Sequence, residues 1–303
     1  METEKYLVRV DTSSNSISKY QKVIGGGFVN LFKRIRIVGI KYILYIVYRL
    51  LKPNKVLKCK LIFDEILYAP LIDPNARQYY FFGAIGPSEA PLTKYFIQTI
   101  NSNDVCYDIG ANYGFYTILF EKFAPNGEVH SFEPNRSCVE VLKKSVQDLQ
   151  RVFVNQVGVY DCVGDLPFYG KSKDYGKGTA ANSLDETVKN NKGFCELYSV
   201  STITLDEYCQ TNVPPTIIKL DIEGGEYKAL LGAKNTLKKH SPTIAMEIWG
   251  GGNGRLHSQK AVSFLFTLGY RLYIIRYDGS FYDMKSLDYD QFESGYYNCL
   301  FKK

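Results

Sequence analysis

Residues Val105–Phe120 read VCYDIGANYGFYTILF and carry the clearest structural pattern of the chain. The stretch begins with a short apolar run typical of a buried strand and ends with an amphipathic run typical of a helix. Between them lies the turn DIGANYG, residues 108–114. Gly110 permits a positive φ or the close approach of another backbone, and the following helix offers unpaired N–H groups to an anionic ligand group. The stretch therefore predicts a strand, turn and helix that bind a ligand.

Strand-like and helix-like runs alternate from this stretch to the C-terminus. Apolar runs typical of strands lie at 105–107, 129–132, 152–157, 217–220, 243–248, 271–276 and 297–301, and runs with helical periodicity lie at 115–123, 138–149, 227–238 and 258–268. Strands that alternate with helices form βαβ units and a mostly parallel sheet covered on both faces. We therefore predict a doubly wound α/β domain.

One long segment interrupts the alternation. Residues 158–204 contain no long helical run, and their middle part is rich in Gly, Lys, Asn and Ser. Such loops are usually functional lids or mobile insertions, although a surface insertion is also tolerated. We expect short antiparallel strands at Leu166–Tyr169 and Val200–Thr204, with a mobile tip between them. Upstream of the core, residues 59–72 indicate a strand pair, and PSEAPLTKYFIQTI indicates a helix.

Composition excludes several classes of protein. The chain has 303 residues, of which 45% are apolar and 15% aromatic, which is enough for a large core and argues against a disordered or fibrous protein. Seven scattered cysteines form no C-x-x-C pair, and the three histidines have no metal-ligand spacing. The N-terminus lacks the apolar run of a signal peptide. We expect a cytoplasmic protein, peripheral at the inner face of a membrane if its basic segment binds lipid.

That basic segment lies near the N-terminus. Between Thr12 and Phe63 there are eleven Lys and Arg residues and no Asp or Glu. Within residues 28–52, helical periodicity places apolar residues on one face and basic residues opposite, which predicts one basic amphipathic helix. Its charge-free runs are far too short to span a bilayer. Two interpretations stay open: the helix lies on an anionic membrane surface, or it packs on the domain with a solvated basic face. We expect residues 1–58 to be an N-terminal extension and 59–303 the domain.

Two common nucleotide-binding motifs do not match the turn. A dinucleotide fingerprint needs glycine at positions 110, 112 and 115, where this chain has Asn112 and Phe115. The single run similar to a P-loop, residues 170–179, has Gly178 where Ser or Thr is needed. NAD and nucleoside triphosphates are therefore disfavoured.

A ligand without a pyrophosphate fits the turn better. S-adenosylmethionine has a carboxylate for a helix N-terminus, cationic groups for nearby carboxylates, and a ribose whose hydroxyls need an acidic acceptor. That acceptor is expected at the end of the second strand, and Glu133 ends the run EVHSFE. The turn and the acid together predict S-adenosylmethionine as the cofactor.

These residues resemble the FkbM-type S-adenosylmethionine-dependent methyltransferases. The similarity rests on VCYDIGANYGFYTILF, VHSFEPN, STITLDEYC, IIKLDIEGGEYKALLGA and PTIAMEIWG, which follow one another in the family's order. It implies a Rossmann-like methyltransferase sheet with an antiparallel C-terminal strand. It also assigns Asp108, Gly110, Asn112 and Gly114 to the cofactor loop, and Glu133 to the ribose. The run FFGAIGPSEAPLTK matches the family only loosely, and residues 28–52 lie outside its domain.

Carboxylates at the ends of the fourth and fifth strands are the predicted catalytic groups. Methyl transfer to oxygen needs alignment and a base, because the acceptor hydroxyl must lose its proton. Asp221 follows the fourth strand, Glu223 lies two residues later, and Glu247 lies near the end of the fifth, before Trp249. Neighbouring carboxylates raise the pKa of at least one toward that of a useful base. For Glu226, in the first helical turn, we prefer a capping role.

The predicted function is O-methylation of a hydroxyl on a glycan or other natural product, and the basic segment suggests a lipid-linked acceptor. The carboxylates could hold Mg²⁺, but no ligand spacing requires a metal, so metal dependence stays open. One alternative is a catalytically inactive, membrane-peripheral binding protein. Another is a nucleic-acid methyltransferase, which we consider unlikely because DIEGGE stands where base methyltransferases usually have Asn/Asp-Pro-Pro-aromatic.

Overall fold

The structure is a computed structural model. It describes residues 2–23, 28–51, 55–73, 76–171, 182–184, 186, 194–249, 252–284 and 296–303.

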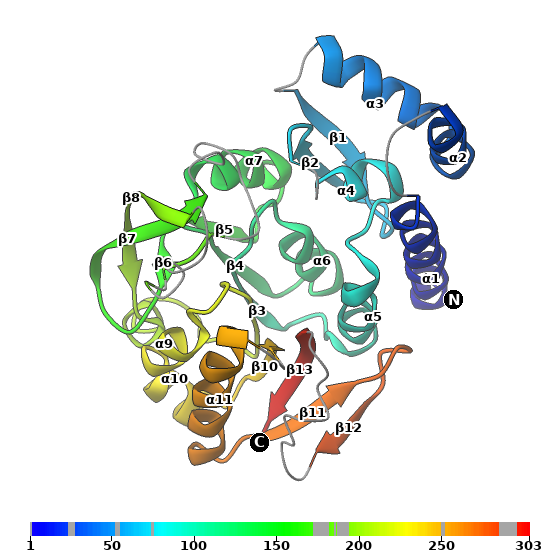
Figure 1. The fold of residues 1–303 in the computed structure, drawn as a ribbon. Helices are drawn as coiled ribbons and strands as arrows, with labels where there is room; N and C mark the ends of the chain where they lie inside the picture. The colour runs from blue at the N-terminus through cyan, green and yellow to red at the C-terminus, as the bar shows by residue number, and fades with distance from the viewer. Residues whose placement is uncertain are drawn as a thin grey trace.

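An eight-stranded sheet runs through the middle of the described chain (Figure 1). Its order is β12 (Phe281–Met284), β11 (Arg271–Ile275), β13 (Tyr296–Lys302), β10 (Thr243–Trp249), β9 (Ile217–Leu220), β3 (Val105–Ile109), β4 (Glu128–Phe132) and β5 (Val152–Asn155). The five strands from β10 to β5 are parallel to one another, whereas β13, β11 and β12 pair antiparallel. The predicted α/β sheet with an antiparallel C-terminal strand is confirmed, and β12 is an element that the sequence did not predict.

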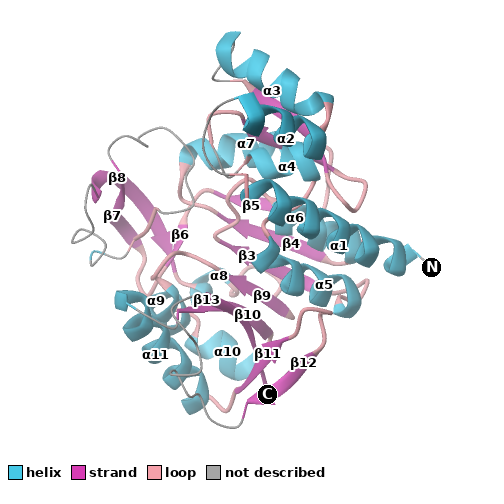
Figure 2. Cartoon of the chain, turned by 45° about the vertical axis from the view of Figure 1, so that its right-hand side comes forward, coloured by secondary structure: helices cyan, strands magenta, loops and turns pink. Residues whose placement is uncertain are grey.

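Helices cover both faces of this sheet (Figure 2). One face carries α5 (Ala90–Thr99), α6 (Phe115–Phe123) and α7 (Arg136–Val146), and the other carries α8 (Leu205–Tyr208), α9 (Glu226–Leu231), α10 (Lys234–His240) and α11 (Gly252–Thr267). Successive side chains of a strand point to opposite faces. Cys106 accordingly packs with Phe96 and Phe120 in one core cluster, while Tyr107 packs with Leu230 in the other. Because both faces are covered, all five residues of β3 are buried.

The strand order reverses next to β3. From β3 the chain continues to β4 and β5 on one side of the sheet, and then returns to β9 and β10 on the other. The loops that leave the carboxyl ends of β3 and β9 therefore diverge. Open α/β sheets bind ligands in the crevice formed at such a point.

The first helix, α1 (Glu2–Gln21), was not predicted from the sequence. Tyr6, Val10 and Ile17 lie on one of its faces and are buried in the core cluster that also contains residues of α5. An ion pair between Asp11 and the buried Lys94 links the two helices. The middle of α1 reads DTSSNS, and these residues have low intrinsic helix propensity, so tertiary packing stabilises the helix.

The prediction of one helix over residues 28–52 was wrong, because the structure contains two. They are α2 (Phe28–Val38) and α3 (Ile40–Leu51), which are separated by Gly39. Gly39 has φ of +72°, a left-handed conformation that glycine adopts readily and that ends a helix. No helix in the described part of the chain has both the length and the hydropathy needed to cross a membrane.

The strand pair upstream of the core is confirmed as the hairpin of β1 (Val56–Lys60) and β2 (Ile66–Pro70). A short helix, α4 (Arg77–Phe82), and a 3₁₀ turn, η1 (Pro87–Glu89), lead from it to α5.

The interruption after β5 forms a second, three-stranded sheet. It consists of β6 (Gly158–Val159), β7 (Gly164–Lys171) and β8 (Phe194–Ile203), and the predicted antiparallel pairing is confirmed between β7 and β8. Both strands are longer than predicted. The predicted mobile tip lies largely outside the described residues.

Candidate active site

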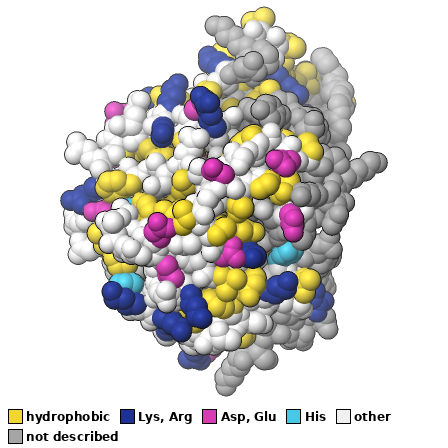
Figure 3. Space-filling view, turned by 90° about the vertical axis from the view of Figure 1, so that its left-hand side faces the viewer, with side chains coloured by type: hydrophobic (Ala, Val, Ile, Leu, Met, Phe, Trp, Pro, Cys, Tyr) yellow, Lys and Arg dark blue, Asp and Glu magenta, His cyan; other side chains and the backbone are white. Residues whose placement is uncertain are grey.

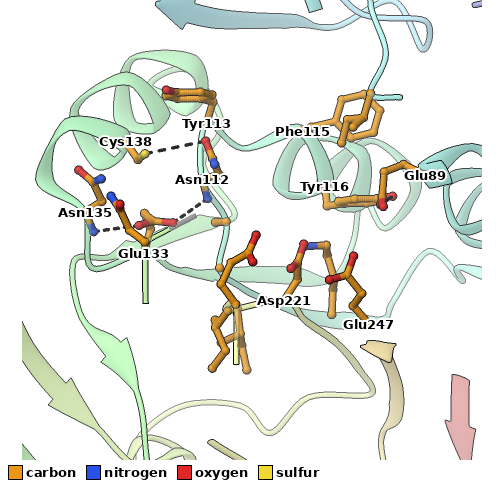
Figure 4. A pocket seen from close by; sticks show the side chains of 18 of the residues that line it. Glu89, Asn112, Tyr113, Phe115, Tyr116, Glu133, Asn135, Cys138, Asp221 and Glu247 are labelled. Carbon is orange, nitrogen blue, oxygen red and sulfur yellow. Dashed lines mark hydrogen bonds and ion pairs between the residues drawn. The ribbon is translucent and has the colours of Figure 1, made fainter. Parts of the chain in front are cut away.

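A pocket lies at the carboxyl ends of β3, β4, β9 and β10, where the strand order reverses (Figure 4). Its volume is about 750 Å³, which is within the range of sites for small molecules. The remaining walls come from segments outside the central sheet. They include Ser18 and Gln21 at the end of α1, Gln78 and Tyr79 of α4, Glu89 of η1, and Phe168, Ser183 and Leu184 of the insertion.

The turn after β3 forms the floor of this pocket. Gly110 has φ of +83°, and a Cβ at this position would collide with the backbone carbonyl of Asp221. The N–H groups of Gly110 and Ala111 both donate to the carbonyl of Phe132, so the turn is held against the end of β4. Glycine is therefore required here for both conformation and space. Gly114, with φ of +94°, precedes α6 and does not line the pocket.

Glu133 lies beside this turn and is buried. Its Oε2 accepts the N–H of Asn112 at 2.9 Å, and its Oε1 accepts the N–H of Asn135 at 2.8 Å (Figure 4). Burial raises the pKa of Glu133 to about 7, although the hydrogen bonds from Asn135 and Asn112 oppose the increase. The carboxyl group lines the pocket and is oriented by two backbone donors.

Asp108 lies beneath the turn and does not line the pocket. Its Oδ2 accepts a 2.6 Å hydrogen bond from Thr117, whose hydroxyl also lies 2.8 Å from that of Ser131. The other oxygen, Oδ1, is buried and has no hydrogen-bond partner among the described residues. In this structure, Asp108 fixes the start of α6 behind the turn and does not face the ligand space.

The end of β9 contributes an ion pair. Nζ of the buried Lys219 lies 3.1 Å from Oδ2 of Asp221 and 5.0 Å from the ring centre of Tyr116. The Asp221 side chain is 38% exposed, so it remains accessible from the pocket. Glu226, the first residue of α9, accepts the N–H groups of Ile222 and Gly224, so it holds the preceding loop, while its capping of the helix stays a prediction.

Two further carboxyl groups face the same space as Asp221. Burial raises the pKa of Glu223 to about 8, and repulsion from Asp221 and Glu226 adds to the increase. Burial raises the pKa of Glu247 to about 10, with further contributions from Asp221, Glu223 and Glu89. Glu223 has φ of +57°, uncommon for a residue with a side chain. The structure thus brings together all three side chains that the sequence predicted as catalytic.

Sequence reasoning missed Glu89. It lies in η1, near the start of α5, and accepts hydrogen bonds from the Tyr116 hydroxyl at 2.8 Å and from the Asn298 amide at 2.9 Å. In β13, Asn298 pairs with Glu247, so Glu89 and Glu247 belong to the same end of the pocket (Figure 4). Burial and repulsion from Asp221 raise its pKa. The available signal was an acid two residues before Pro91, a pattern that usually indicates only a helix start.

The described lining of the pocket is strongly acidic. It includes six carboxyl groups, on Asp73, Glu89, Glu133, Asp221, Glu223 and Glu247, while Lys219 is its single Lys or Arg. Such a site favours a ligand that carries positive charge. Within the described ranges, no three His, Cys, Asp or Glu side chains are arranged to hold a metal ion.

The fold and the pocket define a Rossmann-like α/β protein with an acidic ligand site at its topological switch point. A sequence model of the "Methyltransferase FkbM domain" matches residues 108–272, which is more than half of the chain. The chain therefore belongs to the FkbM family of S-adenosylmethionine-dependent methyltransferases, and the resemblance found in the sequence is confirmed.

Three relatives are similar to this chain at 26% identity. Methyltransferase sdnD of Sordaria araneosa aligns over 59% of this chain and 81% of its own length. The 2-O-methyltransferase NoeI of Sinorhizobium fredii aligns over 45% and 59%, and the hexuronic acid methyltransferase AglP of Haloferax volcanii over 54% and 63%. The chain thus spans less than two thirds of the last two proteins.

Proposed function

We propose that this methyltransferase binds S-adenosylmethionine in the acidic pocket and methylates a hydroxyl group of a glycan or other natural product. The observation that carries the proposal is the set of acidic groups in the described lining, six carboxyl groups against one lysine, which lose their protons more readily beside a bound cation. S-adenosylmethionine carries a sulfonium and an ammonium, and both are attracted to carboxylates. The family supports the same donor.

The residues around the turn suit this donor. Glu133 is oriented by two backbone N–H groups and lies at the end of β4, where a carboxylate can accept hydrogen bonds from ribose hydroxyls. Gly110 lets the turn approach the backbone of Asp221, and the N–H of Asn112 orients Glu133 at the edge of the pocket. Asp108 and Gly114 lie outside the pocket lining, where they position the start of α6: Asp108 accepts a hydrogen bond from Thr117, and Gly114 precedes the helix. We assign these five residues to donor binding, the first three by contact and the last two by position.

We assign the base to Glu247. When bound, S-adenosylmethionine supplies the methyl group: its C–S bond breaks, the electron pair remains on sulfur, and a C–O bond forms at the acceptor. Glu247 takes the proton that the acceptor hydroxyl loses, so the carboxylate becomes a neutral acid. A cation bound beside Glu247 would lower its raised pKa and so favour the ionised form that a base requires. Asp221, fixed by Lys219, and Glu223 orient the acceptor.

The names of two relatives support a sugar as the acceptor. One is a 2-O-methyltransferase and the other acts on a hexuronic acid. In this chain Trp249 lines the pocket beyond Glu247, and an aromatic ring suits the apolar face of a sugar. A nucleic-acid acceptor is less well supported, because a polyanion would be repelled by the same carboxyl groups that favour a sulfonium.

Calorimetric titration with S-adenosylhomocysteine tests donor binding, and Glu133→Gln supplies the comparison. We expect binding to the unmodified protein and an affinity about tenfold to a hundredfold lower in the variant, because a charge-assisted hydrogen bond is lost. Glu140→Gln, which changes an exposed glutamate of α7, is the matched control and should bind normally. Equal affinity in all three proteins would refute the assignment of Glu133, and absence of binding would favour an inactive binding protein.

Transfer of radiolabelled methyl groups to a panel of sugars, lipid-linked sugars and RNA then tests the acceptor. We expect label in sugars and none in RNA. Label in RNA alone would overturn the proposed acceptor class.

A further inference from the structure

The outer face of α3 is apolar and exposed. Ile40, Ile43, Leu44, Val47, Leu50 and Leu51 follow the helical spacing of one stripe, and each is at least 40% exposed. Leu50 reaches 77% and Leu51 74%. Single exposed apolar residues are ordinary, but a continuous stripe marks a surface for interaction. We call these six residues the α3 stripe.

The opposite face of α3 holds the helix on the protein. Tyr42 and Tyr45 are buried, and their rings pack against Phe81 of α4 at 5.9 and 5.3 Å between centres. Nζ of Lys41 donates to the carbonyl of Tyr80 at 3.1 Å. The helix is thus apolar on both faces, and its inner face alone accounts for its packing. In the described chain, none of the six residues of the α3 stripe is a buried or partly buried member of a core cluster.

The neighbouring α2 adds positive charge. Val29 and Phe32 are exposed on one of its faces, and Lys33 and Arg36 are exposed at the positions that continue this face. Residues 12–63 contain no Asp or Glu, so no acid within this segment neutralises these cations. Hydrophobic and basic side chains lie side by side at the top of the molecule in Figure 3, where Figures 1 and 2 place α2 and α3.

We propose that α2 and α3 together bind the surface of an anionic membrane, with the α3 stripe in the boundary between headgroups and acyl chains. A helix that lies in the interface combines an apolar face with basic residues and gains from both apolar burial and attraction to anionic lipid. A protein partner would have to match a long apolar stripe and the neighbouring basic side chains at once. An anionic lipid surface offers acyl chains to the stripe and negative headgroups to the basic side chains, and it needs no specific shape. The combination of apolar and basic residues therefore favours a membrane.

The position of this surface relates it to the pocket. Phe81 packs on α3, and Gln78 and Tyr79 of the same short helix line the pocket. Ser18 and Gln21 line it from the end of α1, which precedes α2. A membrane bound at α2 and α3 would therefore lie near one wall of the pocket. This consequence rests on the proposed function and favours an acceptor displayed on a lipid, whereas membrane binding itself does not depend on any activity.

Flotation of the full chain with vesicles tests the proposal. We expect the protein to float with phosphatidylcholine vesicles that contain phosphatidylglycerol, and much less with phosphatidylcholine alone. Lys33→Ala with Arg36→Ala should weaken partition by roughly thirtyfold. Leu44→Ser with Val47→Ser and Leu50→Ser should weaken it by more than about tenfold, because three apolar side chains are lost.

Matched variants elsewhere on the surface make the result specific. Lys238→Ala with Lys239→Ala removes the same charge from exposed positions of α10, and Val163→Ser with Val213→Ser and Leu256→Ser removes three other exposed apolar side chains. Both should float as the unmodified protein does, and all variants should bind S-adenosylhomocysteine equally if the proposed function holds. Failure of the unmodified protein to float, or equal flotation of all variants, would overturn the membrane proposal. So would a dimer that dissociates only in the α3 variant and does not bind vesicles.

Discussion

Glu247→Gln should make the protein without its cofactor more stable and at the same time inactive. The folded state keeps the proton of Glu247 up to a pKa of about 10, whereas an unfolded chain releases it near the ordinary value of 4.5. Its contribution to stability is therefore complete below about pH 4.5 and is lost as the pH rises toward 10. Each unit of pH in this range costs up to about 1.4 kcal/mol.

At pH 7 the raised pKa of Glu247 therefore lowers the free energy of unfolding by at most about 3 kcal/mol. Glu223 and Glu247 repel each other when both are ionised, so protonation of one lowers the pKa of the other. We therefore expect Glu247→Gln to raise the free energy of unfolding at pH 7 by about half of that maximum, roughly 1–2 kcal/mol. The glutamine is neutral at every pH and nearly isosteric. Its advantage over the unmodified protein should therefore be small near pH 5 and should increase toward pH 8.

Urea denaturation followed by circular dichroism, at several pH values and without cofactor, measures this difference. Glu140→Gln changes an exposed glutamate of α7 and should show no such pH dependence. The same Glu247→Gln protein should bind S-adenosylhomocysteine and transfer no methyl group. Parallel stability curves for the variant and the unmodified protein between pH 5 and pH 8 would show that the pKa of Glu247 is not raised in the folded protein. Full turnover in the variant would remove it as the base.

Gly110→Ala should lose cofactor binding and about 1–3 kcal/mol of stability, because its Cβ would meet the carbonyl of Asp221. Gly269→Ala is the matched control in the same assays: its φ of +86° imposes similar strain but no atom lies near the new Cβ, so it should be milder and bind normally. Equal effects of the two alanines would refute the argument. Thr117→Val should destabilise the fold by about 1–3 kcal/mol in thermal or urea unfolding, because Asp108 would lose the partner of its Oδ2. An unchanged midpoint would show that this bond contributes little.

The central sheet was predictable because burial on both faces leaves apolar runs that can be recognised without knowledge of their partners. The antiparallel end of the sheet was only partly predictable. Strand β12 has mostly exposed or half-exposed residues, so neither periodicity nor a continuous apolar run marks it. Helix α1 was missed because the run DTSSNS, polar and of low helix propensity, separates the buried residues Val10 and Ile17. The break at Gly39 had a signal, since glycine commonly ends a helix.

The candidate site was predictable where a residue type is tied to a strand end, as with Glu133, Asp221 and Glu247. Their mutual approach follows from the parallel register, in which β9 lies between β3 and β10. Glu89 could not be found in this way, because it enters the pocket from a connection outside the sheet. The position of Asp108 beneath the turn likewise depends on side-chain packing, which no sequence pattern specifies. The assignment of individual roles to these residues stays a prediction.

The packing of α1 has a consequence for how the chain can be divided. Its buried face completes the layer over α5, and its last turn reaches the pocket. A shortened chain that begins after this helix would uncover Phe123, whose ring packs on Tyr6, and leave Lys94 without its ion pair. Exposed apolar surface of this kind promotes aggregation. The N-terminal helix thus behaves as an integral layer of the enzyme, and fragments for expression should retain it.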